Sequence, residues 1–368
     1  MPDTPDENNT NYDKRLRILQ INVNKSANAQ LTLLNDDLPM AWDVVLLQEP
    51  SINYYDHILT PRGFRQVYPG TSARAKGTVR SGIWVNENIS TDTWDELDLG
   101  DALDITGIQM NGEYGRLTIF SIYYDCTNNG TEEVLRKYTN DHEQEIYGDG
   151  GHVMWAGDFN QHHPMWDDDK DTRLFTRSAL DDAETLIELA AEWDMEQVLE
   201  KGIPTLEHNV TKLWTRPDNV WLSAHSTSML IKCDTRHELR PPMTGHVPIA
   251  TILDMEMIRA PEIEYKNFRG TDWEEFSDAL ELELNNIDAT HLITNEQEFD
   301  DRVNRIVKAI QAVIEKTVPT SRPKTYTRRW WNKGLERMRK KKQTLSRTHA
   351  KYRDLTEHPA HQEYRDQQ

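Results

Sequence analysis

The sequence predicts an α/β domain followed by an all-helical segment, in a chain whose 368 residues can form one large core and an appendage. Up to about residue 256, short apolar runs rich in branched residues alternate with stretches of helical periodicity. Beyond about residue 265, apolar residues recur only at helical spacing. We therefore expect a disordered N-terminus over residues 1–14, an α/β domain over 15–256 and a helical, basic extension over 265–368.

The expected strands are short apolar runs bounded by turn-forming residues. In chain order they are Leu16–Ile21, Val44–Leu47, Ser81–Asn86, Leu103–Met110, Leu117–Tyr124, Val153–Ala156, Lys212–Thr215, Val220–Ser223, Met229–Lys232 and Pro248–Leu253. Gly157 directly follows one of these runs, and we expect it to allow a tight turn out of the strand.

Helices are expected in the α/β domain where apolar residues share one face. These helices are Ala27–Leu38, Thr131–Tyr147 and Ser178–Trp193. Ser178 and Asp181 form a possible capping box at the start of the last helix.

The extension contains three further helical patterns and no evident strand. A capping box at residues 271–274 opens the first, and an apolar stripe from Phe299 to Ile314 marks the second, which ends before Pro319. A third helix is expected to start near Trp330. Its expected apolar face has nearly heptad spacing and consists of Trp331, Leu335, Met338, Leu345 and Tyr352.

Composition restricts the class of protein. Cys126 and Cys233 are too few for a disulfide framework or a zinc cluster, and they suit a reducing compartment. The polar start of the chain lacks the layout of a signal peptide, and no apolar run approaches membrane-spanning length. We therefore expect an intracellular protein with no membrane partner.

Charge is unevenly distributed along the chain. The formal net charge is −20, but residues 322–353 hold about 13 Lys or Arg against one acid, Glu336. This segment is near +12 and the remainder near −32, since −20 minus +12 is −32. A basic arm on an acidic body indicates a nucleic-acid partner, although a solvated helix face or a nuclear-localisation stretch gives the same pattern.

Five of the expected strands have polar residues at or beside one end. These residues are Asn22, Glu49, Asp158 with Asn160, Asp218 and His246. Hydrolysis of a phosphodiester needs a divalent cation, a carboxylate that activates water and a group that stabilises developing charge. Mg²⁺ takes few carboxylates and keeps several waters, so scattered single residues of this kind fit such a site. Each residue alone is more often a turn former or a surface group, and only the combination favours catalysis.

The same residues stand in motifs that resemble a known superfamily. In order these are Leu-Gln-Ile-Asn-Val-Asn (19–24), Leu-Leu-Gln-Glu-Pro (46–50), Ser-Gly-Ile (81–83), Ser-Ile-Tyr-Tyr (121–124), Gly-Asp-Phe-Asn (157–160), Arg-Pro-Asp-Asn-Val (216–220) and Gly-His-Val-Pro-Ile (245–249). Together they resemble the endonuclease/exonuclease/phosphatase superfamily over about residues 15–254. The stretch 157–166 is most similar to the endonuclease domain of non-LTR (LINE-type) retrotransposons. The resemblance implies a DNase I-like fold of two packed, mixed or antiparallel β-sheets flanked by helices, a four-layer sandwich.

The resemblance implies metal ligands for Mg²⁺ or Mn²⁺. Glu49 is the principal ligand, and Asn22 and Asn24 lie beside it. Many family members have Asp at position 24, and an amide oxygen can ligate without bringing charge. A second departure is Gly245, because the residue before His246 is usually Asp in the family. We therefore expect weakened or lost catalysis, and equal nicking by the chain and its Gly245→Asp variant would contradict this.

The resemblance also implies a catalytic group. Asp158 activates or orients the attacking water, with Asn160 as its hydrogen-bonding neighbour. His246 stabilises the transition state, Asp218 fixes the tautomer of that histidine, and Tyr123 contacts the scissile phosphate.

The leading hypothesis is a DNA-nicking endonuclease of a non-LTR retrotransposon, or a truncated derivative, acting in the nucleus. DNA is the expected partner, RNA an alternative one, and a reverse transcriptase absent from this chain a further one. The expected nucleic-acid contacts are Arg74, Lys76, Arg80, Arg328, Arg329, Lys340, Lys341 and Lys342. One alternative is a catalytically inactive nucleic-acid-binding remnant. Another is a phosphatase or phosphodiesterase that acts on small or lipid phosphate esters.

Overall fold

The computed structural model describes residues 15–35, 38–55, 57–70, 74, 77–125, 130–259, 265–287, 292–321 and 333–367. The chain forms two compact units, one of Met1–Ala260 with Arg328–Gln368 and one of Pro261–Thr327. The helical extension expected over 265–368 is therefore divided, and its last helices belong to the first unit. The expected disorder of residues 1–14 and the expected helix start at Trp330 lie outside the described residues.

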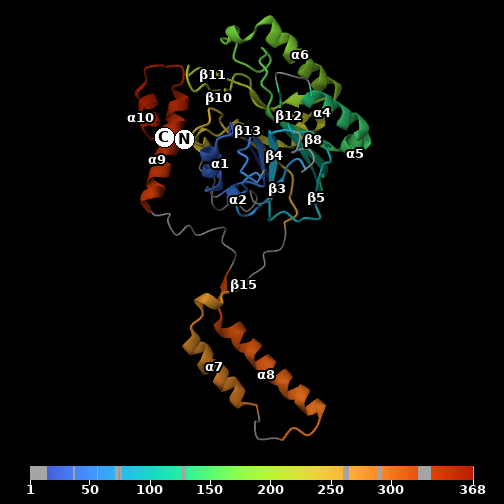
Figure 1. Ribbon diagram of the computed structural model, residues 1–368, viewed down its shortest axis with the longest axis vertical. Helices are drawn as coiled ribbons and strands as arrows, with labels where there is room; N and C mark the ends of the chain where they lie inside the picture. Colours follow the sequence, from blue (N-terminus) through green and yellow to red (C-terminus); the bar gives the residue numbers. More distant parts are fainter. Residues whose placement is uncertain are drawn as a thin grey trace. The chain divides into compact units, whose positions relative to one another are not determined.

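Two six-stranded sheets form the centre of the first unit, as far as the described residues show (Figure 1). The first sheet, in the order β13-β14-β1-β2-β4-β3, consists of β1 (Leu16–Asn22), β2 (Val44–Gln48), β3 (Phe64–Val67), β4 (Ser81–Asn86), β13 (Leu230–Thr235) and β14 (Ile249–Leu253). The second, in the order β5-β6-β7-β8-β12-β9, consists of β5 (Trp94–Glu96), β6 (Ile105–Gly112), β7 (Gly115–Tyr123), β8 (His152–Asp158), β9 (Met195–Gln197) and β12 (Asp218–Ser223). Both sheets are mixed, because β1 pairs with β2 and β7 with β8 in parallel, whereas the other pairs are antiparallel.

Helices cover the outer face of each sheet. Apolar residues of α1 (Ala27–Leu34) and α2 (Leu38–Ala41) join a core with the first sheet. Residues of α4 (Gly130–Asp141), α5 (Glu143–Tyr147) and α6 (Arg177–Glu192) join a core with the second. The predicted DNase I-like sandwich of two sheets flanked by helices is therefore confirmed.

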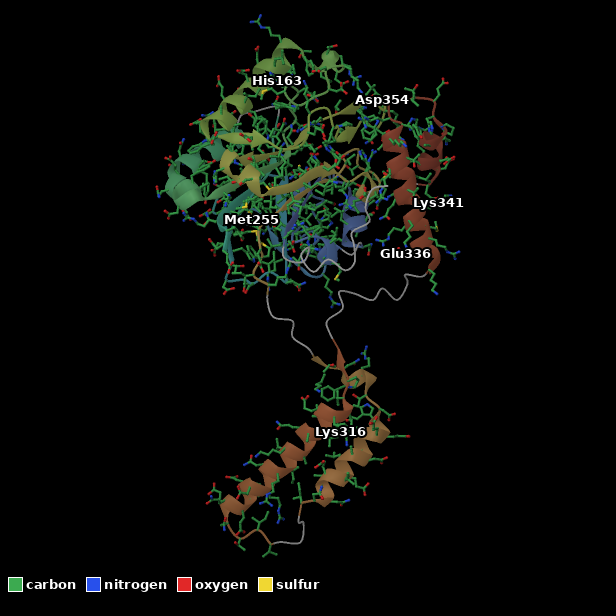
Figure 2. The ribbon with its side chains drawn as sticks, turned by 180° about the vertical axis from the view of Figure 1, so that it is seen from behind. His163, Met255, Lys316, Glu336, Lys341 and Asp354 are labelled. Atoms are coloured by element: carbon green, nitrogen blue, oxygen red, sulfur yellow. The ribbon has the colours of Figure 1, made fainter. Side chains whose placement is uncertain are left out.

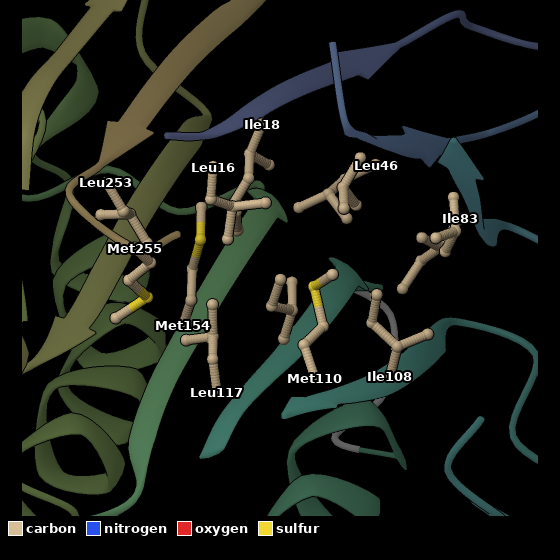
Figure 3. Close-up of a cluster of buried hydrophobic side chains, with 14 of the residues drawn as sticks. Leu16, Ile18, Leu46, Ile83, Ile108, Met110, Leu117, Met154, Leu253 and Met255 are labelled. Carbon is tan, nitrogen blue, oxygen red and sulfur yellow. The ribbon is translucent and has the colours of Figure 1, made fainter. Parts of the chain in front are cut away.

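Alternation along the strands builds a third core between the two sheets. In β1, Leu16 and Ile18 point into this inter-sheet core, whereas Leu19 and Ile21 pack under α1 and α2. Figure 3 shows Leu16 and Ile18 near Met154 of β8 and Leu117 of β7. Buried apolar side chains thus fix which face of each strand looks toward the opposite sheet.

Several predicted ends of helices in the first unit are wrong in detail. The first helix ends at Leu34 rather than Leu38, and the second is divided at His142, whose backbone angles are φ −121° and ψ 22°. The third helix begins after Thr176, whose side chain accepts a hydrogen bond from Ala179 N, so Ser178 is not the cap.

The C-terminal helices of the first unit are α9 (Lys333–Lys351) and α10 (Pro359–Gln367), which pack against each other. The predicted apolar face of α9 is only partly correct. Met338 is 55% exposed, and the buried residues of α9 are instead Ser346, His349 and Ala350.

The second unit is built from α7 (Trp273–Asn285) and α8 (Glu296–Thr317). Asp272 caps α7 by accepting from Glu274 N and Glu275 N, so it replaces the expected capping box that starts at Thr271. The expectation of no strand is wrong here, because β15 (Tyr265–Lys266) and β16 (Thr320–Ser321) form a short antiparallel ladder.

Candidate active site

The inter-sheet face of β1 changes from apolar to polar along the strand. Leu16 and Ile18 are followed on the same face by Gln20 and Asn22, both buried. On β2 the last residue of this face is Gln48, which lies opposite Asn22 in the parallel register. The same alternation thus sends polar side chains into the space between the sheets, at the end where these strands finish.

The second sheet brings a matching polar row to this end. In the antiparallel pair of β8 and β12, Asp158 lies directly opposite Asp218, and in the parallel pair of β7 and β8 it lies beside Tyr123. The expected tight turn at Gly157 is wrong, because this residue lies within β8 rather than after it, and glycine is required there for another reason. A Cβ at position 157 would lie 1.8 Å from the carbonyl oxygen of Ile122, so only glycine permits this approach of the two strands.

Asn22 joins the two sheets at the site. Its amide Nδ2 donates to Asp158 Oδ2 at 2.6 Å and lies 3.4 Å from Glu49 Oε2. Glu49 follows β2 with a φ of +46°, in the left-handed region that residues with a side chain seldom adopt. This turn directs a buried carboxylate toward Asn22, and Lys25 Nζ lies 3.1 Å from its other oxygen, Oε1.

His246 is held by a buried acid. Its Nδ1 lies 2.8 Å from Asp218 Oδ2, an oxygen that also accepts from Thr205 Oγ1 at 2.8 Å. Gln20 Nε2 donates to the other oxygen of Asp218 at 3.0 Å. Because Asp218 accepts the hydrogen bond from Nδ1 of His246, the other ring nitrogen, Nε2, faces Asp158 Oδ2 at 3.8 Å.

Burial and neighbouring charges shift the pKa values of Asp158 and His246, the two groups that face each other in the site. Burial and the negative charge of Asp218 raise the pKa of the Asp158 carboxyl to about 7. Burial alone would lower the pKa of His246, but the charge and hydrogen bond of Asp218, with the charge of Asp158, raise it to about 9. The imidazole therefore keeps its proton to a higher pH than an ordinary histidine, and the carboxyl opposite it ionises at a higher pH than an ordinary aspartate.

Several residues of the site were not predicted from the sequence. Gln20 donates to Gln48 Oε1 at 2.7 Å, and Gln48 donates to Ser121 Oγ of β7 at 2.9 Å. These three buried side chains form a hydrogen-bonded chain that joins the two sheets beside the acids. Thr205, which lies before β10 (Leu206–Glu207), completes the shell around Asp218. The sequence does contain a signal for this hydrogen-bonded chain, because Gln20 and Gln48 interrupt otherwise apolar strands, and a buried amide needs hydrogen-bond partners.

The other expected site residues lie around this group. Asn160 donates from its amide to Tyr124 O at 3.0 Å, and its backbone N–H donates to Asp158 Oδ1. Asn24 is exposed, and its backbone N–H rather than its side chain contacts the site, through Asn22 Oδ1 at 2.7 Å.

The predicted nucleic-acid contacts are in different environments. Arg80 forms ion pairs with Asp104 and Asp125 and lies over the ring of Tyr123 at 5.0 Å, so it supports the tyrosine. The guanidinium of Arg74 lies over Tyr68. Lys340 and Lys341 are exposed on α9, where Figure 2 labels Lys341, and Lys342 is partly buried. Lys76, Arg328 and Arg329 lie outside the described residues.

Position 245 is closed by a neighbouring strand. A Cβ on Gly245 would lie 2.5 Å from the carbonyl oxygen of Glu207 and 2.7 Å from Leu206 Cδ1, both in β10. Glu207 N also donates to Gly245 O at 3.0 Å. The proposed restoration by Gly245→Asp is therefore unsuitable as a test, because the aspartate has no room beside β10.

Asp158, Asp218 and His246 could hold a metal ion by their spacing, since one ligand atom from each lies within 4.8 Å of the others. Asp218 is already saturated by Gln20, Thr205 and His246, and His246 carries a raised pKa. The carboxylate oxygens of Glu49 and Asp158 are the harder donors, and they suit Mg²⁺ or Mn²⁺ better, whereas Asn22 turns its Nδ2 rather than its Oδ1 toward them.

Comparison with known proteins agrees with this fold. The sequence pattern of a family described as endonuclease-reverse transcriptase matches residues 117–244, which span β7, β8 and β12. None of the curated proteins matches the sequence. In the part of the chain that the structure describes, no helix has both the length and the apolar character of a membrane span.

The two packed sheets and their flanking helices define a fold of the DNase I-like class. Among solved structures, the endonuclease domain of TRAS1, a telomere-specific non-LTR retrotransposon, is similar with a TM-score of 0.50 and 17% identity, over 65% of this chain and 99% of that chain. The AP endonuclease LMAP from Leishmania major is similar with a TM-score of 0.51 and 13% identity, over 67% of this chain and 89% of that one. The resemblance expected from the sequence motifs is therefore confirmed by the fold and, over residues 117–244, by the sequence pattern.

Proposed function

We propose that this chain hydrolyses phosphodiesters in DNA with a divalent cation, as a nicking endonuclease of the non-LTR retrotransposon type. The observation that carries the proposal is the convergence of Glu49, Asp158 and His246, from two sheets, on one buried end of the sandwich. Scattered single residues of these types meet the three requirements of phosphodiester hydrolysis.

Glu49 and Asp158 are the residues that would hold Mg²⁺ or Mn²⁺, and Asn22 lies between them with its Nδ2 toward both carboxylates. Two carboxylates face one amide, and Glu49 Oε1 already attracts the ammonium of Lys25, which is 59% exposed and free to move aside. A cation here would neutralise the phosphate and offset the mutual repulsion that raises the pKa of Asp158. These donors and their charges fit a hard divalent ion.

Asp158 and His246 divide the proton chemistry between them. Asp158, once ionised, accepts a proton from the attacking water or orients that water. His246, kept protonated by Asp218, presents Nε2–H to the negative charge that develops on the phosphate or the leaving oxygen. Tyr123, steadied by Arg80, would contact the phosphate from the neighbouring strand.

The charge of α9 favours nucleic acid over a small or lipid ester. Lys340 and Lys341 are exposed on this helix of the first unit, and phosphate contacts of this kind supply sequence-independent affinity. An enzyme of this type would act in the nucleus, together with a reverse transcriptase. Gly245 favours one alternative, a nucleic-acid-binding protein without catalysis.

One experiment separates these functions. Supercoiled plasmid is incubated with the full chain and Mg²⁺, beside Asp158→Asn and the control Asp169→Asn, whose carboxylate is 83% exposed. Nicking by the wild type and the control, lost in Asp158→Asn, supports the proposal. Retarded but intact plasmid supports the inactive alternative, and hydrolysis of a phosphate-ester panel without any effect on plasmid supports the phosphatase alternative.

A further inference from the structure

A second buried polar cluster lies outside the candidate active site, where α9 and α10 meet β10. Its centre is the carboxylate of Glu207, whose Oε2 accepts from Arg240 Nη1 at 2.6 Å and from His349 Nε2 at 3.1 Å. The other nitrogen of His349, Nδ1, lies 2.7 Å from Nδ1 of His361 in α10. Glu207, Arg240, His349 and His361 are all buried, at 5–7% exposure.

The hydrogen-bond chain assigns the protons of this cluster. His361 Nε2 lies 2.8 Å from the carbonyl oxygen of Leu355, which can only accept, so this nitrogen carries a proton. His349 Nε2 must likewise donate, because it faces an ionised carboxylate. Burial alone would raise the pKa of Glu207, but the hydrogen bond from His349 and the charge of Arg240 lower it to about 2.

The same cluster is bonded to the backbone of the turn that carries His246. Glu207 N donates to Gly245 O at 3.0 Å, and Leu206 forms a β-bridge with His246. Arg240 Nε donates to Thr244 O at 3.3 Å. The main-chain positions on both sides of the turn are therefore tied to Glu207 and to its guanidinium partner.

Helix α9 covers the segment that leads into this turn. Ser346 Oγ donates to His237 O at 2.6 Å, and Lys342 Nζ lies 3.5 Å from Arg240 O. Arg347 also pairs with Glu238 at 3.5 Å. Figure 1 shows α9 and α10 beside β10 and β11 (Trp214–Thr215), in agreement with the contacts of His349 with Glu207 and Trp214. The C-terminal helices therefore cover the strand and the segment that adjoin the His246 turn.

We propose that Glu207, held by His349 of α9, is a positioning residue that sets the His246 turn, so that the C-terminal helices are part of the catalytic unit. This inference rests on the proposed function. Glu207 touches no reacting atom, and it acts through the backbone of β10 and through Arg240. Loss of this support would let Nε2 of His246 leave the position 3.8 Å from Asp158, which lowers turnover more than substrate binding.

The test compares two substitutions at one position in the full chain. His349→Leu removes the donor to Glu207, whereas His349→Gln keeps an amide N–H that can reach the same carboxylate. We expect kcat for plasmid nicking to fall about tenfold in His349→Leu with KM nearly unchanged, and to recover largely in His349→Gln.

A matched control is Glu238→Gln, because Glu238 also pairs with a basic residue of α9, Arg347. None of the contacts described above joins Glu238 to β10. This variant should keep the kcat of the wild type. If His349→Leu does not fold, Glu207→Gln takes its place, with a smaller loss of kcat in the same direction.

The ring signals of His246 in proton–carbon NMR spectra give a readout that does not need activity. A shift of these signals in His349→Leu or Glu207→Gln, but not in Glu238→Gln, supports the positioning role even if the wild type does not nick DNA. Absence of nicking by the wild type would then count against the proposed function alone. Unchanged His246 signals and an unchanged kcat in a folded His349→Leu or Glu207→Gln variant overturn the inference.

Discussion

Replacing Gly245 with aspartate should destabilise the first unit and lower nicking, although the family resemblance suggests the opposite. The new Cβ would lie 2.5 Å from Glu207 O, whereas ordinary contacts begin near 3.4 Å, so β10 would have to move by about 0.9 Å. That movement would also strain the 3.0 Å hydrogen bond from Glu207 N to Gly245 O. Overpacking of this kind costs about 1–3 kcal/mol, and a lost hydrogen bond about 0.5–1.5 kcal/mol.

The expected loss of stability is therefore about 2–4 kcal/mol, or roughly 3–6 °C in the melting temperature of a unit of about 300 residues. Circular dichroism during heating and plasmid nicking at 25 °C measure the two effects. Gly70→Asp is the matched control, because a Cβ at Gly70 has nothing within 4 Å and should leave both unchanged. A Gly245→Asp variant that is as stable as the wild type and nicks faster would refute the reasoning.

Three further predictions concern the site and the basic helix. Asp218→Asn should lower kcat about 10- to 100-fold with little change in KM, because the amide can no longer fix the His246 imidazolium; a kcat equal to that of the wild type would contradict this role. The nicking rate should rise as Asp158 ionises, at a pH below about 7 because the bound cation lowers the raised pKa of this carboxyl, and fall as His246 loses its proton through about 9, with both limbs belonging to the coupled pair. A nicking rate that stays constant from pH 6 to 10, under conditions in which the chemical step limits the rate, would rule out these assignments. Changing Lys340 and Lys341 to Ala together should weaken plasmid binding at every sequence and reduce the slope of log affinity against log salt by about two, measured by gel retardation at several salt concentrations. An unchanged slope would remove α9 from the DNA-binding surface.

The main strands could be predicted from sequence because they are buried runs with a clear alternation. Ser81–Asn86 is predicted to the residue, and β1, β2, β8 and β14 within two residues at either end. The missed strands β3, β5, β9 and β10 have only two to four residues, too few to show a period of two. Their pairing comes from tertiary contacts, as the bridge from Leu206 to His246 shows.

The candidate site was predictable as a set of residue types but not as a geometry. Glu49 follows β2, Asp158 ends β8 and His246 lies before β14, and the motifs around them resemble one superfamily. The sequence did not reveal that Gly245 faces β10, because this strand has two residues and no pattern of its own. It also did not reveal that His349 reaches Glu207, since the spacing of α9 predicts an apolar face rather than a buried histidine.

The central claim is that Glu49 and Asp158 hold a divalent cation for phosphodiester hydrolysis, and a cation titration tests it most directly. The rate of plasmid nicking is measured against Mg²⁺ concentration for the wild type, for Glu49→Gln and for the control Glu87→Gln, whose side chain is exposed. We predict that a chelator abolishes nicking by the wild type, that Glu49→Gln needs about tenfold or more Mg²⁺ for half of its maximal rate, and that Glu87→Gln follows the wild-type curve. Nicking that survives the chelator, or a Glu49→Gln curve that coincides with that of the wild type, would contradict the account.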